Sequence, residues 1–144
     1  MRPRSPYRLG VHNLKRKDDS MSIKIEKLKQ IIEELKEDLG NGFVSTDIWA
    51  TADAQSLVGY NSQPKAVALF NEVTRMLDKT LKNAEFPGLG DYYLVHLDNN
   101  HLVVILSIGA YQQSILVDLS KTTMGILMSV VLPKVLSGLE EATK

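Results

Sequence analysis

Apolar residues first recur at helical spacing over residues 22–42. They lie three and four positions apart, which places them on one face of an amphipathic helix. Ser22 can cap the start of this helix, and the Gly40–Gly42 stretch ends it. The pattern is too short for a coiled coil, so we expect the helix to pack on a sheet. Its apolar face consists of Ile25, Leu28, Ile32, Leu35 and Leu39.

Strand-forming residues dominate the next segment. Residues 43–51 and 56–61 are rich in β-branched and aromatic side chains, and the polar stretch 52–55 separates them. This arrangement predicts a β-hairpin. Asp47 and Asp53 lie in it, and paired carboxylates can carry acid–base or metal chemistry. Nothing in the pattern makes the two converge, and Asp53 suits a turn, so we expect no catalytic role for them.

Three further apolar runs, at 92–97, 101–109 and 114–119, are separated by Asp-Asn-Asn and Ala-Tyr-Gln-Gln. Both separators are typical of turns, so the runs predict an antiparallel meander. The middle run shows almost no polar alternation between Leu102 and Ile108. A strand of this kind is covered on both faces, so we expect helices on both sides of the sheet.

The helix predicted over residues 62–83 has a wide apolar arc, and Pro64 suits its first turn. At about 100° per residue the arc covers roughly 180°, more than the roughly 100° stripe that one core face needs. Leu69 and Met76 lie at the edge of the arc, outside the stripe that one core face needs. This edge predicts a surface where a second copy of the helix packs. A deeply buried helix in a monomer is the alternative. The arc runs through Met76, Leu69, Val73, Ala66, Leu77, Phe70, Leu81 and Val67.

A last helix is predicted over residues 122–144, and Pro133 inside it should kink the helix and free the Ser129 carbonyl. The elements follow the order helix, strand, strand, helix, three strands, helix, which indicates an α+β fold. The apolar stripe of this last helix comprises Met124, Leu127, Met128, Val131, Leu132, Val135 and Leu139.

Charge divides the 144-residue chain into two parts. Residues 1–20 hold six Lys or Arg and two Asp, a net charge of +4, whereas the other 124 residues hold 11 basic and 15 acidic residues, a net charge of −4. The acidic body argues against a nucleic-acid partner. The basic tail is predicted to be disordered, and Met21 to be the natural start of one domain at 21–144. The alternative is an arm that touches anionic lipid or RNA.

Several kinds of chemistry lack their sequence signals. The chain has no cysteine, no phosphate-binding loop, no complete G-x-G-x-x-G and no G-x-S-x-G. We therefore expect no cofactor and no enzymatic activity. The longest apolar runs are too short to span a bilayer, and no secretory signal is visible. These features predict a soluble cytoplasmic protein without membrane contacts.

The sequence does not decide whether one hairpin end, at residues 96–101, forms a metal site. If its turn has two residues, His96, Asp98 and His101 share one face and can reach a single ion. If its loop spans 98–100, Leu97 pairs with His101 and His96 points to the other face. The sequence permits both registers. We expect a plain polar hairpin end, because turn residues belong there in either case.

Two long stretches, "TDIWATADAQSLVGYNSQPKAVALFNEVTRML" and "FPGLGDYYLVHLDNNHLVVILSIGAYQQSILVDL", together with the element order, resemble the Roadblock family of dynein light chains and bacterial GTPase regulators. The resemblance runs from about residue 23 to residue 139. It implies a Roadblock/profilin-like fold, in which a five-stranded antiparallel sheet carries the second helix on one face and the first and last helices on the other. The first hairpin departs from the family, because its turn lacks the glycine often found there.

The resemblance also implies a function. Family members form homodimers in which the second helices pack together and the third strands pair edge to edge. The chain is accordingly expected to be a non-enzymatic homodimeric regulator or scaffold for a small Ras-like GTPase, with GTPase activation among its roles. A structural subunit of a motor-type assembly and a small-molecule sensor are the alternatives. The residues implied at the dimer interface are Ala66, Leu69, Phe70, Val73, Met76, Tyr92, Leu94 and His96.

Overall fold

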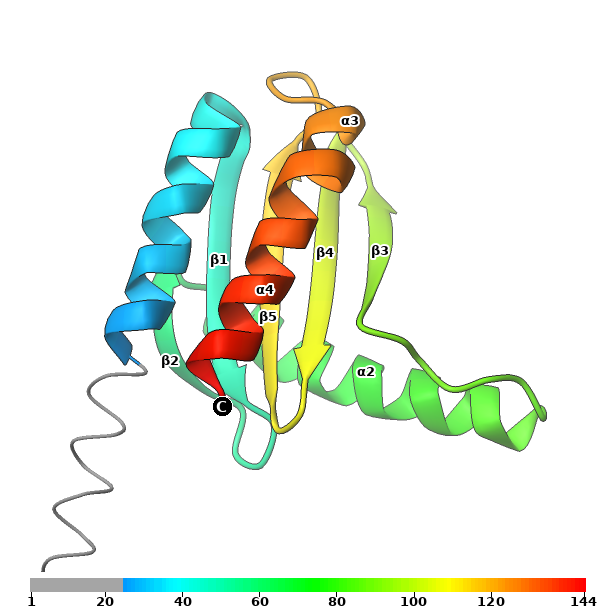
Figure 1. Cartoon of the computed structure of the whole chain (residues 1–144). Helices are drawn as coiled ribbons and strands as arrows, with labels where there is room; N and C mark the ends of the chain where they lie inside the picture. Colours follow the sequence, from blue (N-terminus) through cyan, green and yellow to red (C-terminus); the bar gives the residue numbers. More distant parts are fainter. Residues whose placement is uncertain (1–24) are drawn as a thin grey trace, which may run out of the picture.

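The structure is a computed structural model that describes residues 25–144 (Figure 1). The predictions for the tail at 1–20, for Met21 and for the Ser22 cap lie outside these residues. The described chain begins with a helix over residues 25–39 and the short turn η1 (Gly40–Gly42). It continues through β1 (Phe43–Ala50), β2 (Gln55–Tyr60), α2 (Pro64–Asn83), β3 (Tyr92–Leu97), β4 (His101–Ile108) and β5 (Tyr111–Asp118). It ends in a helical segment made of α3 (Met124–Ile126), η2 (Leu127–Val131) and α4 (Leu132–Ala142).

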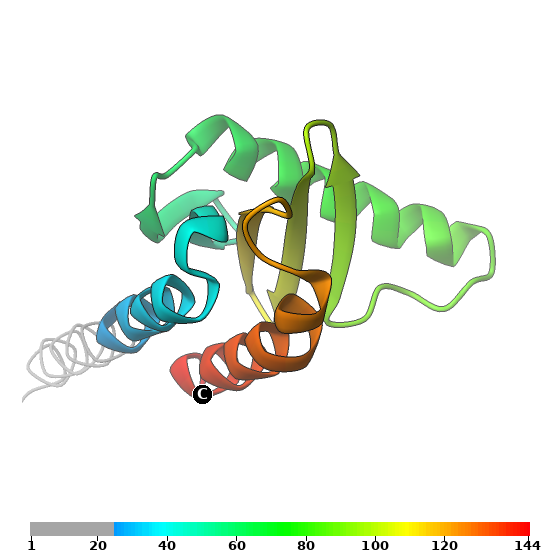
Figure 2. The same ribbon diagram turned by 90° about the horizontal axis from the view of Figure 1, so that it is seen from above.

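The five strands form one antiparallel sheet in the order β2-β1-β5-β4-β3. The first helix and the C-terminal helical segment cover one face, and α2 crosses the other (Figure 2). The predicted α+β fold, with helices on both faces of a five-stranded antiparallel sheet, is confirmed.

The main core lies between the sheet and the two helices at the chain ends. Alternate residues of β1, β4 and β5 point into it, and the fully buried ones include Ile48, Val104 and Ile115. Most of both predicted helical stripes is buried there. Met124 is an exception, because its side chain is 44% exposed. The core takes its helical part from Leu28, Ile31, Leu35, Leu39, Leu127, Val131, Leu132, Val135, Leu139 and Ala142.

One polar side chain is enclosed in this core. Gln113 is 0% exposed, and its Nε2 donates to Thr46 Oγ1 at 3.0 Å. Its Oε1 has no hydrogen-bond partner among residues 25–144. A buried carboxamide that is only half satisfied lowers the stability of the fold.

Two turns differ from the sequence prediction. The predicted turn at 110–113 is wrong, because Tyr111, Gln112 and Gln113 belong to β5 and the β4–β5 turn is Gly109-Ala110. Gly109 has a φ of +57°, which a glycine adopts without steric cost and which allows so short a turn. The turn of the first hairpin was predicted at residues 52–55 and lies at residues 51–54. It contains no glycine, and Ala54 adopts the positive φ, +55°, that a glycine often supplies in such a turn.

Pro133 acts through a π-helical stretch. The five residues Leu127–Val131 form this stretch, and the Leu132 N–H donates to the Leu127 carbonyl. Pro133 follows in the first turn of α4, where its missing N–H is tolerated. The predicted helix is thus divided here into α3, η2 and α4, and the proline follows directly after the π turn.

Helix packing in the main core generates a prediction at Gly138. A Cβ at this position would lie 3.0 Å from Ile31 Cγ1 and 3.2 Å from its Cδ1. A helical Gly→Ala change normally stabilises by roughly 0.5–1 kcal/mol, but overpacking costs about 1–3 kcal/mol. We expect Gly138→Ala to lower the free energy of unfolding in urea by about 1 kcal/mol. Gly125→Ala is the matched control and should not destabilise, because its Cβ meets only Thr123 Oγ1, at 3.8 Å. Equal effects of the two changes would contradict the packing argument.

Candidate protein-interaction surface

Helix α2 is held to the sheet by polar contacts. The Trp49 Nε1–H donates to Asn71 Oδ1 at 3.0 Å, and Asn71 Nδ2 donates to the Thr51 carbonyl at 3.1 Å. One turn further on, Thr74 Oγ1 and the Tyr93 hydroxyl are 2.8 Å apart. Burial raises the pKa of Tyr93, which keeps its hydroxyl protonated. These bonds fix which side of α2 faces the sheet.

The edge of the apolar arc at Leu69 and Met76 is consequently turned away from the sheet. Only Val67 and Thr74 are buried among the 20 residues of the helix. Leu69 and Met76, in contrast, are 55% and 56% exposed. At about 100° per residue, the stripe through these two exposed residues lies roughly 160° from the sheet-facing stripe. The alternative of a deeply buried helix is therefore wrong for the single chain.

The C-terminal half of α2 also projects beyond the edge of the sheet. Both views show it running past β3 before the chain returns through residues 84–91 (Figures 1 and 2). Asp78 ties this loop down, since its Oδ1 accepts from the Leu89 N–H at 2.9 Å and its Oδ2 pairs with Lys82 at 2.9 Å. The Leu89 N–H and the Lys82 ammonium hold the pKa of Asp78 below its usual value. Phe86 in this loop is 64% exposed, so apolar surface continues past the helix.

Strand β3 presents an open edge beside this overhang. It is the last strand of the sheet and pairs only with β4, in regular register from Tyr92↔Leu106 to Leu97↔His101. Its sequence, YYLVHL, contains no proline, Lys, Arg or carboxylate that would discourage pairing. The opposite edge, β2, is less regular, because a bulge interrupts its register with β1 between Ile48 and Trp49. The β3 edge is therefore the better template for another strand.

The eight predicted interface residues fall into two groups. On α2, Leu69 and Met76 are exposed, while the other three are half-buried. The β3 residues point to the face opposite α2, where Leu94 packs against the main core and the other two are exposed. The β3 side chains on the α2 face were not among the predicted residues, because the sequence does not show which alternate set faces that helix. The half-buried α2 residues are Ala66, Phe70 and Val73, the remaining predicted β3 residues are Tyr92 and His96, and the missed ones are Tyr93, Val95 and Leu97.

Asp47 has a structural role. It is 2% exposed, and its carboxylate accepts from Ser56 Oγ at 2.8 Å, from the Ser62 hydroxyl, and from the Gln63 N–H at 2.9 Å. These bonds fasten the β2–α2 connection to β1. Gly59 leaves room for them, because a Cβ there would lie 2.6 Å from Asp47 Oδ1. Three of the roughly four acceptor positions of the carboxylate are thus used within the fold, which gives Asp47 a structural role.

Asp53 stays in its turn. Its Oδ1 accepts from the Gln55 N–H at 3.1 Å, on the exposed end of the first hairpin. This contact is the local turn-stabilising bond expected of an aspartate. The structure thus gives the two carboxylates separate roles.

The histidine hairpin adopts the register without a metal site. Leu97 pairs with His101 and His96 with Leu102, so the loop spans residues 98–100. His96 and His101 consequently point to opposite faces, and His101 Nδ1 lies 2.8 Å from the Asn99 carbonyl. Within residues 25–144, no cluster of three or more His, Asp or Glu side chains could hold a metal ion.

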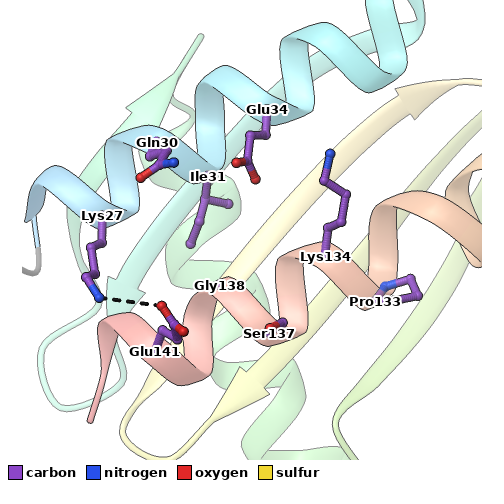
Figure 3. A pocket seen from close by; sticks show the side chains of 9 residues that line it. All are labelled: Lys27, Gln30, Ile31, Glu34, Pro133, Lys134, Ser137, Gly138 and Glu141. Carbon is purple, nitrogen blue, oxygen red and sulfur yellow. Dashed lines mark ion pairs between the residues drawn. The ribbon is translucent and has the colours of Figure 1, made fainter.

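A groove of about 530 Å³ runs between the first helix and α4 (Figure 3). Ile31 and Gly138 line it where the two helices approach closely. Lys27 and Glu141 pair across it at 3.5 Å, as the dashed line in Figure 3 marks. Lys134 pairs with Asp38 at 2.8 Å, and this bond raises the pKa of Lys134. The groove is a seam between two helices with solvated ion pairs along it.

No helix within residues 25–144 has the length and apolar character needed to cross a bilayer. The features that remain as a candidate site are the outer stripe of α2, the exposed Phe86 loop and the open β3 edge. We call these together the α2–β3 surface. A surface of this kind, apolar and bordered by a free strand, characterises proteins that act by binding other chains.

Comparisons with known proteins identify the fold. A scan of protein families finds no match, and no curated protein matches the sequence. Solved structures do match. MglB of Myxococcus xanthus aligns with a TM-score of 0.67 at 12% identity, covering 83% of this chain and 92% of that one. The gliding protein mglB of Thermus thermophilus aligns with a TM-score of 0.67 at 9% identity, covering 83% and 90%. A Roadblock/LC7 domain from Streptomyces avermitilis aligns with a TM-score of 0.54 at 11% identity, covering 75% and 92%.

The chain therefore has the Roadblock/LC7 fold, as the sequence resemblance implied. At these identities the likeness concerns the fold, and the roles of individual residues rest on the geometry above.

The Asp47 geometry generates a prediction. Asp47→Ala removes the acceptor of three donors in a buried place, so we expect it to lower the free energy of unfolding by about 2–4 kcal/mol. Asp53→Ala, the control, removes one exposed bond and should cost less than about 1 kcal/mol. Denaturant unfolding of both variants measures the difference. Similar losses from the two changes would show that the buried network does not hold the β2–α2 connection.

Proposed function

We propose that this protein is a non-enzymatic, cytoplasmic, homodimeric regulator or scaffold that binds a small Ras-like GTPase. The observation that carries the proposal is the α2–β3 surface, in which a stripe of exposed apolar side chains lies beside an unpaired strand edge. Apolar area favours burial against a partner, and the free backbone groups of a strand edge are in register to pair with another strand.

A second copy of the chain suits this surface. A two-fold axis at the β3 edge would pair the two strands antiparallel and set the overhanging half of each α2 beside the other. One operation then covers Leu69, Met76 and the strand edge together. One solved structure with this fold is titled "MglB with tetrameric arrangement" and aligns with a TM-score of 0.61 at 11% identity, which supports self-association as a mode open to the fold.

The GTPase partner rests on the resemblance to bacterial Roadblock regulators, and the fold supports it. A regulatory rather than catalytic role agrees with the fate of the candidate catalytic groups. Asp47 is buried and bonded to three donors of the β2–α2 region, and the histidines of the β3–β4 hairpin point to opposite faces.

The dimer can be tested at Leu69. A carboxylate in the middle of an apolar contact costs far more in the dimer than in the exposed monomer. We expect the wild-type protein to sediment at twice the 16.1 kDa chain mass and Leu69→Asp to sediment as the monomer. Circular dichroism should show the same secondary structure for both. Met124→Asp is the matched control, because Met124 is 44% exposed on the opposite face of the molecule, and it should remain dimeric. A monomeric wild type, or a dimeric Leu69→Asp, would contradict the proposal.

The GTPase can be tested in two stages. Tagged protein is incubated with lysate of the source organism containing either GDP or a non-hydrolysable GTP analogue, and bound proteins are read by mass spectrometry. We expect a Ras-like GTPase to be enriched with the analogue. The purified GTPase is then assayed for phosphate release with wild type and with Leu69→Asp.

The outcomes separate the roles. Faster phosphate release indicates a GTPase activator, and nucleotide-dependent binding without faster release indicates an effector or scaffold. Recovery of the same partners in both nucleotide states would favour a structural subunit of a larger assembly. If no GTPase binds in either state, the proposal is wrong.

A further inference from the structure

Helix α2 contacts mainly one end of its face of the sheet. Its hydrogen bonds reach Trp49 and the Thr51 carbonyl at the end of β1, and Tyr93 at the start of β3. In Figure 1 the helix crosses behind the lower ends of the strands. Two cross-strand rows on the same face lie toward the other ends of the strands, and we call them the distal rows. They are Val95–Val103–Leu116 and Leu97–His101–Asp118.

The distal rows carry apolar side chains that the chain itself covers incompletely. Leu97 is 38% exposed, and Val95 and Leu116 are half-buried. Val103 is buried between them. Val104, on the other face of the same strand, is in contrast fully buried in the main core. The α2 face of the sheet thus has an apolar end that favours a further cover.

The flank of α2 that faces the distal rows is apolar. Arg75 and Lys82 lie on the other flank. They line a hollow there with Ser107 and Gln112, at the end of the sheet that α2 contacts. At about 100° per residue, Val73 lies roughly 160–180° around the helix from both charged residues. The apolar flank of α2 and the distal rows therefore adjoin each other.

The C-terminal part of α2 carries its sheet-facing stripe past the sheet. Thr74 contacts Tyr93 on the edge strand β3, so residues 75–83 form an overhang beyond that edge (Figure 2). At about 1.5 Å per residue they extend roughly 14 Å. Leu81 continues the stripe of Thr74, and the Phe86 N–H donates to its carbonyl at 2.9 Å. Because Phe86 is 64% exposed, the overhang ends in apolar surface without a strand of its own chain beneath it.

The two-fold axis of the proposed dimer brings the overhang and the distal rows together. Antiparallel neighbours in one sheet are related by an axis perpendicular to that sheet. Such an axis keeps both copies of α2 on one face and exchanges the two ends of the sheet. Each helix therefore crosses one end of its own sheet and, past the β3 edge, the opposite end of the partner's sheet. With strands about 4.8 Å apart, an overhang of roughly 14 Å reaches across the first two strands of the partner.

We propose, on the basis of the dimer proposed above, that the α2 overhang of each protomer covers the distal rows of the other. Leu81 and Phe86 then lie over Val95 and Leu97 of the partner subunit. Each protomer completes the second apolar layer of its partner, and the charged flank of α2 stays in water. The occupant of the distal rows is therefore a second copy of this chain, and the GTPase binds elsewhere on the dimer.

Chemical cross-linking tests the contact directly, because the chain has no cysteine of its own. The double variant Phe86→Cys/Leu97→Cys is treated with a short bis-maleimide and separated on a denaturing gel. We expect most of the protein to run as a covalent dimer. The matched control is Phe86→Cys/Met124→Cys, since Met124 is exposed on the other face of the molecule. It should give at most one tenth of that cross-linked product.

Sedimentation of the untreated proteins separates this contact from the dimer itself. If the Phe86→Cys/Leu97→Cys variant is dimeric but cross-links no better than the control, the placement of the overhang is wrong and the proposed function stands. A monomeric wild type would overturn the dimer and, with it, this placement.

Dimer affinity gives a second readout that needs no cross-link. A carboxylate at either side of the proposed contact opposes its burial. We expect Phe86→Asp and Leu97→Asp each to weaken dimerisation at least tenfold in sedimentation equilibrium, and Met124→Asp to leave it unchanged. Unchanged affinity in either of the first two variants overturns the proposal, as does equal weakening by Met124→Asp.

Discussion

The hydrogen bonds between α2 and the sheet determine the character of the molecule. Trp49 to Asn71 and Tyr93 to Thr74 are contacts between polar atoms with fixed directions, so they set the rotation of α2 about its axis. A helix held only by apolar packing would turn its most apolar side toward the sheet. Here the polar contacts turn Leu69 and Met76 outward, and the surface for a partner follows from that rotation.

The two faces of the sheet have different roles. Toward the helices at the chain ends, Ile48, Val104 and Ile115 make a dry, close-packed core. Toward α2, the same strands present the polar Asp47 and Gln112 beside the fully buried Trp49. Helix α2 covers this face with hydrogen bonds as well as with its buried Val67. Residues adjacent in one strand thus belong to an apolar core on one face and to a mixed polar and apolar layer on the other.

The sequence predicts the layers better than it predicts their orientation. Apolar spacing located every helix and strand and the coverage of both sheet faces, because periodicity reports burial directly. It misplaced Tyr111, Gln112 and Gln113 in a turn, because a short run of polar residues between two apolar runs is typical of a turn. The register of the β3–β4 hairpin was left open between two values, since turn length alone decides it.

The sequence likewise predicted part of the candidate surface and not the rest. The wide apolar arc of α2 identified Leu69 and Met76 as candidates for contact, and both are exposed. The sequence could not show that Tyr93, Val95 and Leu97 lie on the α2 side of β3, because this depends on the three-dimensional pairing. Nothing in the sequence showed that α2 runs past the edge of the sheet, because this depends on how the helix crosses the strands.

The thin attachment of α2 has a dynamic consequence. A 20-residue helix with two buried residues is held by far less burial than the main core, so its local opening requires only part of the free energy of global unfolding. We expect amide hydrogens of α2 to exchange faster than those of β4 and β5, through fluctuations that leave the main core closed. A partner bound to the outer face of α2 would slow that exchange. The amide exchange rate of the helix would therefore report whether a partner is bound there.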